Sequence, residues 1–287
     1  MRGWWINAFA AILNHPPHAR VLPMLSPLAS RFMLTTSRNR PYLLYMTTHE
    51  RWEKAQAYER KHWEHKAESI HAHKDDLTWY KWRADRLVAL LAEHAPISNL
   101  DQAEILEIGS GPVGMASFLP GRQVHAIDPL CDFYTSRPDL THNRNPRVRY
   151  VNGGAEQLPW ESGKFALVVI DNVIDHTQDP GRVLDEIVRV LAAKGVLYLS
   201  VNVRTRWGLM MRKLMERFEV DKGHPHSYTS EIMKTLVRSH GFTVLYDREQ
   251  DRAEAKRIEL KAGHARSVVK FLLGLYDIHF ELLARKG

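Results

Sequence analysis

Short apolar runs alternate with polar and glycine-rich segments from about residue 100 onward. Five runs rich in Val, Ile and Leu have the length and composition of strands buried in a parallel sheet. They are residues 104–108, 123–127, 148–151, 166–171 and 196–201. The segments between several of them show helical spacing, and this alternation predicts an α/β fold with right-handed crossovers.

The later part of the chain carries signals for further elements. Two more apolar runs, 243–247 and 278–284, predict a final pair of strands. Asp179 followed by Pro180 is typical of a helix N-terminus. Thr229 and Gly241 similarly mark the start and end of another helix.

The first hundred residues have a different composition. Residues 1–45 contain five arginines, no acidic residue and an apolar patch that includes Trp4 and Trp5. This leader suits a targeting segment, a segment lying on a membrane surface, or a loosely ordered extension. Residues 46–100 are helical in pattern and rich in aromatics, so we expect a helical cap before an α/β domain at 101–287.

Charge and cysteine content exclude several classes of protein. The formal net charge is +7, but five of the positive charges lie in the leader, so the body is nearly neutral and nucleic-acid binding is not expected. The single cysteine excludes internal disulfides and cysteine-rich zinc sites, and no metal site is predicted. It fits a reducing, cytoplasmic location, with peripheral membrane contact through residues 1–45 left open. No apolar run is long enough to cross a bilayer.

The turn after the first apolar run carries the main chemical signal. Gly109 and Gly111 lack a Cβ, so the backbone there can turn tightly and approach a ligand closely. Asp128 ends the second run, where its carboxylate could accept hydrogen bonds from the two hydroxyls of a ribose. Glycines followed by a strand-end acid indicate an adenosine-containing cofactor.

The same residues carry a resemblance to a known family. Glu107-x-Gly109-x-Gly111-Pro112 with Asp128-Pro129 resembles the first two motifs of class I S-adenosylmethionine-dependent methyltransferases. Four later stretches, 154–160, 165–176, 185–195 and 224–229, resemble the family in order and spacing. The resemblance covers about residues 80–287. It implies a Rossmann-like sheet of five parallel strands plus an antiparallel C-terminal pair, with helices on both faces and a helical N-terminal extension.

What the resemblance implies about function is methyl transfer from S-adenosylmethionine to a small-molecule or glycan acceptor, preferably at oxygen. The methionine end would contact the glycine turn, the ribose the acid after the second strand, and the adenine the loop after the third. The residues assigned to the cofactor in this way are Glu107, Gly109, Ser110, Gly111, Asp128, Pro129, Ala155, Glu156, Asp171 and Asn172. Two positions depart from the family pattern. Gly154 stands where Asp is common, and the turn after Lys194 lacks a second glycine.

A hydroxyl or amine acceptor must lose a proton as it is methylated. His176 is the first candidate base, with His224 and His226 as second choices, because an imidazole pKa of about 6.5 suits neutral pH. A purely structural role is the alternative for each. Two other functions also remain open. The glycine turn would suit the pyrophosphate of an NAD(P)-dependent oxidoreductase, and the fold could belong to a non-catalytic cofactor-binding protein.

Overall fold

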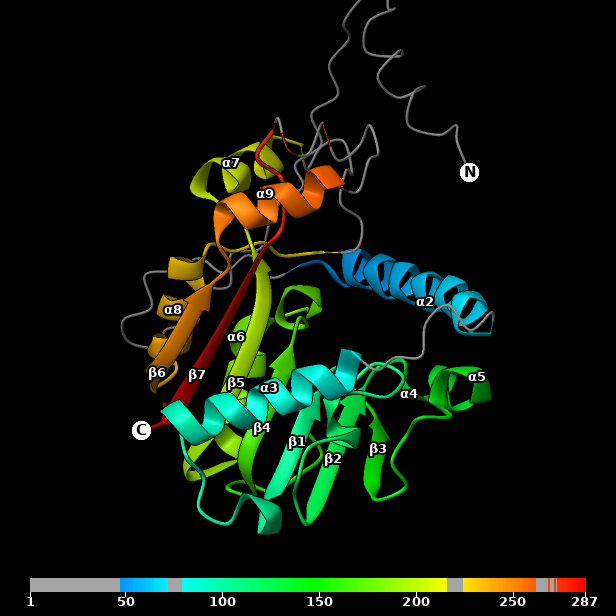
Figure 1. Cartoon of the computed structure of the whole chain (residues 1–287), viewed down its shortest axis with the longest axis vertical. Coiled ribbons are helices and arrows are strands. Elements are labelled where there is room, and N and C mark those ends of the chain that lie inside the picture. The colour runs from blue at the N-terminus through cyan, green and yellow to red at the C-terminus, as the bar shows by residue number, and fades with distance from the viewer. Residues whose placement is uncertain (1–46, 72–78, 216–223, 262–267, 269–270, 272) are drawn as a thin grey trace, which may run out of the picture. The chain divides into compact units, whose positions relative to one another are not determined.

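The computed structural model of the chain describes residues 47–71, 79–215, 224–261, 268, 271 and 273–287 (Figure 1). The leader at 1–45 lies outside these residues. Within the described part, seven strands form a sheet of order β3-β2-β1-β4-β5-β7-β6. The strands are β1 (Glu104–Ile108), β2 (Gln123–Asp128), β3 (Val148–Asn152), β4 (Phe165–Asp171), β5 (Leu191–Val203), β6 (Phe242–Glu249) and β7 (Ile278–Lys286).

The sheet has the predicted mixture of directions. Strands β1 to β5 pair in parallel, and β7 runs antiparallel to both β5 and β6. This confirms the predicted fold class, and six strands begin and end within two residues of the predicted bounds.

The start of β5 was predicted wrongly. The apolar run suggested a start at residue 196. In the structure Leu191 pairs with Phe165, and the register then shifts before the regular pairing of Val196 with Leu167. Lys194 lies in this irregular stretch with a φ of 61°, a left-handed conformation that glycine adopts more easily. The ladder therefore begins earlier than hydrophobicity alone indicates.

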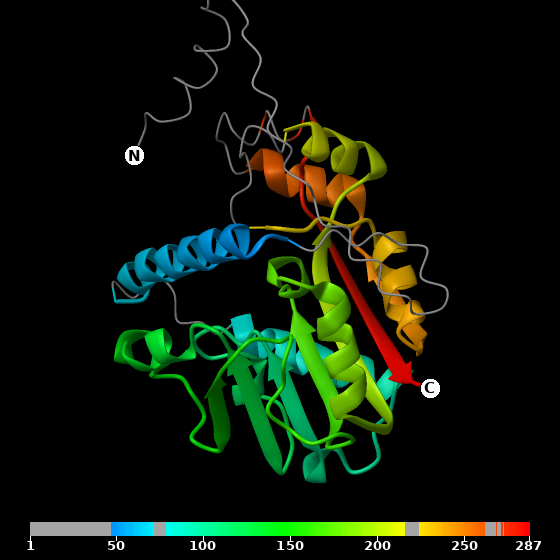
Figure 2. The same cartoon turned by 180° about the vertical axis from the view of Figure 1, so that it is seen from behind.

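Helices cover both faces of the sheet (Figures 1 and 2). Alternate residues of each strand contact opposite layers, so Ile105 of β1 packs with the helix that precedes it and Leu106 with a helix on the other side. The helices are α2 (His49–His71), α3 (Trp79–His94), α4 (Cys131–Thr135), α5 (Pro138–Thr141), α6 (Pro180–Val190), α7 (Arg206–Met215), α8 (Ser230–Ser239) and α9 (Arg252–Lys261), with short 3₁₀ turns η1 (Leu100–Gln102), η2 (Met115–Ser117) and η3 (Ile174–His176). Helix α3 belongs to one layer and helices α6 and α8 to the other.

The predicted helix ends are confirmed by their hydrogen bonds. Asp179 accepts from the backbone N–H groups of the second and third residues of α6, and Pro180 is the first helical residue. Thr229 caps α8 in the same way, and Gly241 follows that helix with a φ of 85°. Polar residues thus satisfy backbone groups that the helix itself leaves unpaired.

The carboxyl ends of the parallel strands meet at one edge of the sheet, and α2 lies beyond that edge (Figure 1). Trp63 of α2 is buried and packs edge to face on Tyr134 of α4, with ring centroids 5.9 Å apart. Helix α2 therefore covers the edge where ligands of open α/β sheets bind. No helix of the described ranges is long and apolar enough to cross a membrane.

Candidate active site

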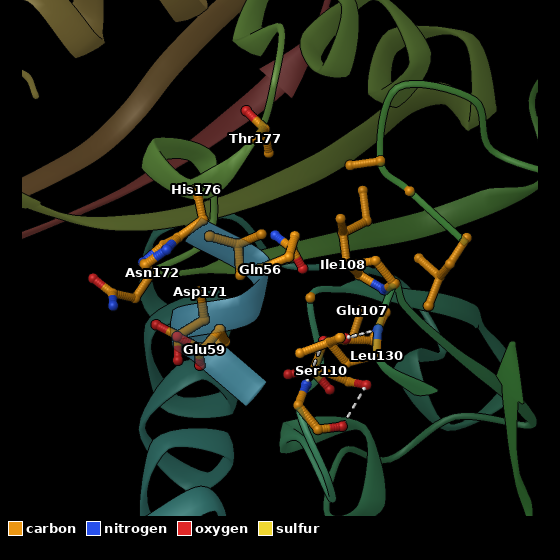
Figure 3. Close-up of a pocket in the computed structure, with 18 of the residues that line it drawn as sticks. Gln56, Glu59, Glu107, Ile108, Ser110, Leu130, Asp171, Asn172, His176 and Thr177 are labelled. Atoms are coloured by element: carbon orange, nitrogen blue, oxygen red, sulfur yellow. Dashed lines mark hydrogen bonds between the residues drawn. The ribbon is translucent and has the colours of Figure 1, made fainter. Parts of the chain in front are cut away.

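A cavity of about 430 Å³ lies at the carboxyl edge of the parallel strands (Figure 3). Its walls come from the loops after β1, β2, β3 and β4 and from helices α2 and α3. All ten residues that the sequence assigned to the cofactor line this cavity, together with His176. The volume falls in the range of about 300–1,000 Å³ that is common for small-molecule sites.

The turn after β1 requires glycine at two positions. Gly109 and Gly111 have φ angles of 71° and 60°. A Cβ on Gly109 would lie 2.3 Å from the side chain of Val173, and one on Gly111 would lie 2.9 Å from the hydroxyl of Tyr80. No side chain fits at either place without displacing these neighbours. The bare backbone of the turn consequently forms part of the cavity wall.

Asp128 connects the glycine turn to the loop after β2. Its two carboxylate oxygens accept hydrogen bonds from the backbone N–H groups of Gly111 and Leu130, at 2.9 and 2.8 Å. Burial raises the pKa of Asp128 to about 6, against the opposing effect of these two bonds. Each oxygen can accept one further bond. The same side chain can therefore hold the turn and still receive the hydroxyls of a ribose.

Glu107 lies beneath the turn and is almost fully buried. Its carboxylate accepts from the backbone N–H groups of Met115 and Ala116, at 3.0 and 2.7 Å. Burial raises the pKa of Glu107 to about 8. A cation beside it, such as the ammonium of an amino acid, would favour the ionised form. The residue is suited to the methionine end of the cofactor.

The loop after β3 is held by Glu156. One carboxylate oxygen of Glu156 accepts from the backbone N–H groups of Gln178 and Asp179, at 2.7 and 3.3 Å. Its carbonyl oxygen accepts from the side chain of Arg182 at 2.8 Å. The side chain thus fixes the loop to the start of α6. Neighbouring Ala155 can offer backbone groups to an adenine ring.

Two polar residues end β4, and the structure distinguishes them. Both carboxylate oxygens of Asp171 are engaged, one by the guanidinium of Arg83 and the other by the hydroxyl of Ser200. Asn172 instead has a left-handed φ of 57°, and its buried Oδ1 has no hydrogen-bond partner among the described residues. Buried polar atoms without partners are rare. A strained residue with a spare acceptor at a cavity wall is suited to a ligand's donor group.

Two histidines and one aspartate form a polar cluster at the other side of the cavity. Asp175 is buried, and its Oδ2 lies 2.8 Å from Nδ1 of His224. Its Oδ1 lies 3.9 Å from Nε2 of His176, and the two imidazole rings are 4.4 Å apart. Burial alone would raise the pKa of Asp175, but the two histidines outweigh it and lower the pKa to about 2. Asp175 is therefore a carboxylate at neutral pH.

The sequence missed the pairing of Asp175 with His224, because these residues are 49 positions apart. Of the second-choice histidines, His224 lines the cavity, whereas Nε2 of His226 lies 2.9 Å from the carbonyl oxygen of Thr177.

Ligand-type atoms of Asp175, His176 and His224 lie within 4.8 Å of one another, close enough to hold a metal ion. The predicted lack of a metal site accordingly stays a prediction.

Aromatic residues of α2 complete the enclosure. Trp52, Tyr58 and Trp63 all line the cavity, as do the polar side chains of Gln56 and Glu59 that Figure 3 labels. Trp63 also donates a hydrogen bond to Glu59 at 2.9 Å. The helix therefore both packs on the core and supplies one wall of the site.

Comparisons with known proteins agree with this geometry. A family model described as a methyltransferase domain matches residues 106–199, which contain the end of β1, strands β2 to β4 and the cavity loops that follow these strands. Over these residues the chain is therefore similar to a methyltransferase domain. Methyltransferases of this family use S-adenosylmethionine as the methyl donor.

Individual relatives are distant. The protein-lysine N-methyltransferase EFM2 of Saccharomyces cerevisiae is 24% identical over 162 residues, covering 46% of this chain. The chain spans only 39% of that protein's length. Phosphoethanolamine N-methyltransferase 2 of Haemonchus contortus, solved with phosphomonomethylethanolamine and S-adenosylhomocysteine, has a TM-score of 0.53 at 17% identity, covering 70% of this chain and 52% of its own. A geranyl diphosphate methyltransferase in complex with S-adenosylmethionine has a TM-score of 0.52 at 14% identity, covering 71% and 85%. These two structures share the fold.

Proposed function

We propose that this chain transfers the methyl group of S-adenosylmethionine to an acceptor that enters the cavity beside His176 and His224. The observation that supports this most directly is the convergence of ten sequence-assigned cofactor residues and two imidazoles on one cavity. The methyltransferase-domain match supports this reading over the NAD(P)-dependent alternative. We keep the acceptor class as a small molecule or glycan, methylated at oxygen.

In the proposed site, each group has a separate task. Gly109 and Gly111 allow the backbone to approach the methionine end, and Glu107 balances its ammonium. Asp128 accepts from the ribose hydroxyls, and Asn172 offers an amide oxygen to the ligand. The cofactor supplies a methyl group already activated by a sulfonium, so the protein mainly has to position the acceptor.

Proton transfer is assigned to the imidazole cluster. The hydroxyl oxygen of an acceptor would form a bond to the methyl carbon while the bond from that carbon to the sulfonium sulfur breaks, leaving S-adenosylhomocysteine. An imidazole nitrogen would take the proton from the hydroxyl. When the carboxylate of Asp175 accepts a hydrogen bond from Nδ1 of His224, Nε2 is the basic nitrogen of this ring. His176 remains the parallel candidate. Both rings lie beside the carboxylate of Asp175.

Ligand binding tests the cofactor assignment first. Titration calorimetry should show that S-adenosylhomocysteine binds the protein and NADH does not. Binding of NADH without S-adenosylhomocysteine would overturn the proposal.

Histidine variants then test the proton transfer. Loss of the base should lower kcat by about 10²–10⁴-fold, with little change in the affinity for S-adenosylhomocysteine. We expect this for His224→Ala, a smaller loss for His176→Ala, and none for the control His142→Ala, an exposed histidine outside the cavity. In the wild type, kcat/KM should rise with pH as the catalytic imidazole loses its proton. If that rise persists in both cavity variants, neither histidine is the base.

An amine acceptor is the second candidate, because the yeast relative is named for lysine methylation. Mass spectrometry of products from a hydroxyl-bearing glycan and a lysine-containing peptide distinguishes the two. Methylation of the peptide alone would refute the oxygen assignment and leave the cofactor assignment intact.

A further inference from the structure

Helix α7 presents large apolar side chains to solvent. Trp207, Met210 and Leu214 are 54%, 50% and 66% exposed. They recur at intervals of three and four residues, which places them on one side of a helix with 3.6 residues per turn. Arg206 and Lys213 are exposed on the same side. The helix contains no acidic residue.

The opposite side of α7 packs against the protein. Gly208 packs closely against the segment that precedes β7. A Cβ at this position would lie 2.2 Å from the carbonyl oxygen of Gly274. Arg212 is only 7% exposed and donates a hydrogen bond to the carbonyl oxygen of His224. The usual orientation of an amphipathic helix is thereby reversed, because the arginine faces the protein and the apolar stripe faces outward. The buried contacts fix this orientation.

The surroundings of α7 carry a similar mixture of side chains. Helix α9 lies toward the same end of the sheet as α7 (Figures 1 and 2). It exposes Ile258 and Leu260, at 56% and 43%. Its exposed cations are Arg252, Lys256, Arg257 and Lys261. Glu254 is exposed on the same helix, so α9 combines exposed apolar groups with an excess of basic over acidic side chains.

We infer that the outward face of α7, formed by Arg206, Trp207, Met210, Lys213 and Leu214, binds the surface of a membrane that contains anionic lipids. A Trp-containing apolar stripe beside lysine and arginine is typical of helices that lie in the membrane interface. The two cations match anionic headgroups, whose negative surface potential attracts basic side chains. A protein partner fits less well, because lysine is depleted at the centre of protein interfaces.

The docking surface lies next to the proposed site. Arg212 connects the inner side of α7 to the backbone of His224, whose ring lines the cavity. A membrane bound to the outer side would hold this end of the cavity near the lipid headgroups. The inference itself does not depend on methyl transfer, because membrane binding is measured without acceptor.

Vesicle sedimentation of the full-length chain tests the inference. Vesicles of phosphatidylcholine with phosphatidylserine should retain the wild type, and vesicles of phosphatidylcholine alone should retain much less. The triple variant Trp207→Ala, Met210→Ala, Leu214→Ala should bind at least about tenfold more weakly, because binding scales with the apolar area inserted. Arg206→Ala with Lys213→Ala should remove the preference for anionic vesicles.

Matched controls keep the result specific to α7. Trp82→Ala removes an equally exposed tryptophan, 64% exposed, from helix α3, and it should bind vesicles like the wild type. Met210→Glu alone should reproduce most of the loss, so the test does not depend on the triple variant. Met210→Glu and the triple variant should both retain wild-type affinity for S-adenosylhomocysteine, which would show that their fold is intact.

Three results would overturn the inference. The first is wild-type vesicle binding by the triple variant. The second is binding that is lost in Trp4→Ala with Trp5→Ala but kept in the triple variant, since the leader would then be the membrane-binding segment. The third is that the wild type does not bind vesicles and is dimeric by light scattering, while the triple variant is monomeric. A second copy of the chain would then cover the α7 face.

Discussion

At the scale of single residues, Asp128 has two roles that compete for one carboxylate. Its oxygens hold the N–H groups of Gly111 and Leu130, and the proposed ribose would use the remaining lone pairs. A neutral amide of the same shape keeps one acceptor oxygen but turns an NH₂ group toward one of the two backbone donors. The charge and the geometry of this position can therefore be separated experimentally.

Asp128→Asn should weaken the binding of S-adenosylhomocysteine by about 1.5–3 kcal/mol, or roughly ten- to a hundredfold, because a charge-assisted acceptor is lost. Titration calorimetry measures this directly. Asp132→Asn is the matched control, since Asp132 lies in the next helix and bonds Asn152 at 2.6 Å. Equal affinity of Asp128→Asn and wild type would show that the ribose is held by another residue.

The positions of residues at the cavity were predictable where they depend on local sequence, and the contacts that depend on the fold were not. Gly109, Gly111 and Asp128 belong to a strand–turn pattern that is visible in the sequence. The sequence could not reveal that Arg83 and Ser200 occupy both oxygens of Asp171. Nor could it show that His224 reaches Asp175, because that contact joins two distant loops.

At the scale of elements, α3 is connected to the end of β4 by charge. Arg83 lies on α3 and pairs with Asp171, whose side chain is 9% exposed. Ser200 lies on the neighbouring strand β5, and its hydroxyl donates a hydrogen bond to the same carboxylate. One ionic cluster thus joins the helical cap to the centre of the sheet, directly beside Asn172.

Arg83→Ala should lower the free energy of unfolding by roughly 2 kcal/mol, less than the 3–5 kcal/mol typical of fully buried pairs because Arg83 is a third exposed. Urea denaturation measures the change. Lys81→Ala on the same helix breaks only an exposed pair with Asp85 and should cost about 0–1 kcal/mol. If the two variants lose the same stability, the buried carboxylate does not depend on Arg83.

The existence and chain order of the seven strands were accessible from the sequence, whereas helices α7 and α9 and the boundary of β5 were not. Hydrophobic runs report where side chains are buried, and they therefore located six strands closely. The early start of β5 depends on backbone pairing of Leu191 with Phe165 across an irregular stretch. Such pairing leaves no hydrophobic pattern in the sequence.

At the scale of the whole molecule, two buried acids make stability depend on pH. The folded-state pKa values of Glu107 and Asp128 are about 8 and about 6, above their ordinary values of 4.5 and 3.8. A carboxyl group whose pKa rises on folding binds its proton more tightly in the folded state. Its contribution to the stability of the folded state is therefore largest at low pH and is lost as pH rises through the folded-state pKa.

The cofactor-free protein should consequently lose stability between pH 5 and 8.5, measured as the free energy of unfolding in urea. The decline should be smaller in Glu107→Gln, which cannot ionise. A wild type and a variant with parallel pH profiles would contradict the raised pKa of Glu107. Saturating S-adenosylhomocysteine should reduce the wild-type decline, because its ammonium favours the ionised acid.

The contact between Gly109 and Val173 has a consequence for engineering the site. A methyl group on Gly109 would overlap the side chain of Val173, which follows Asn172 in the loop after β4. The cofactor turn and the loop that borders the acceptor end are therefore interlocking surfaces. Changing acceptor preference through position 173 also changes the space in front of the turn. Libraries aimed at a new acceptor should therefore keep position 173 no larger than valine, or they will select against cofactor binding first.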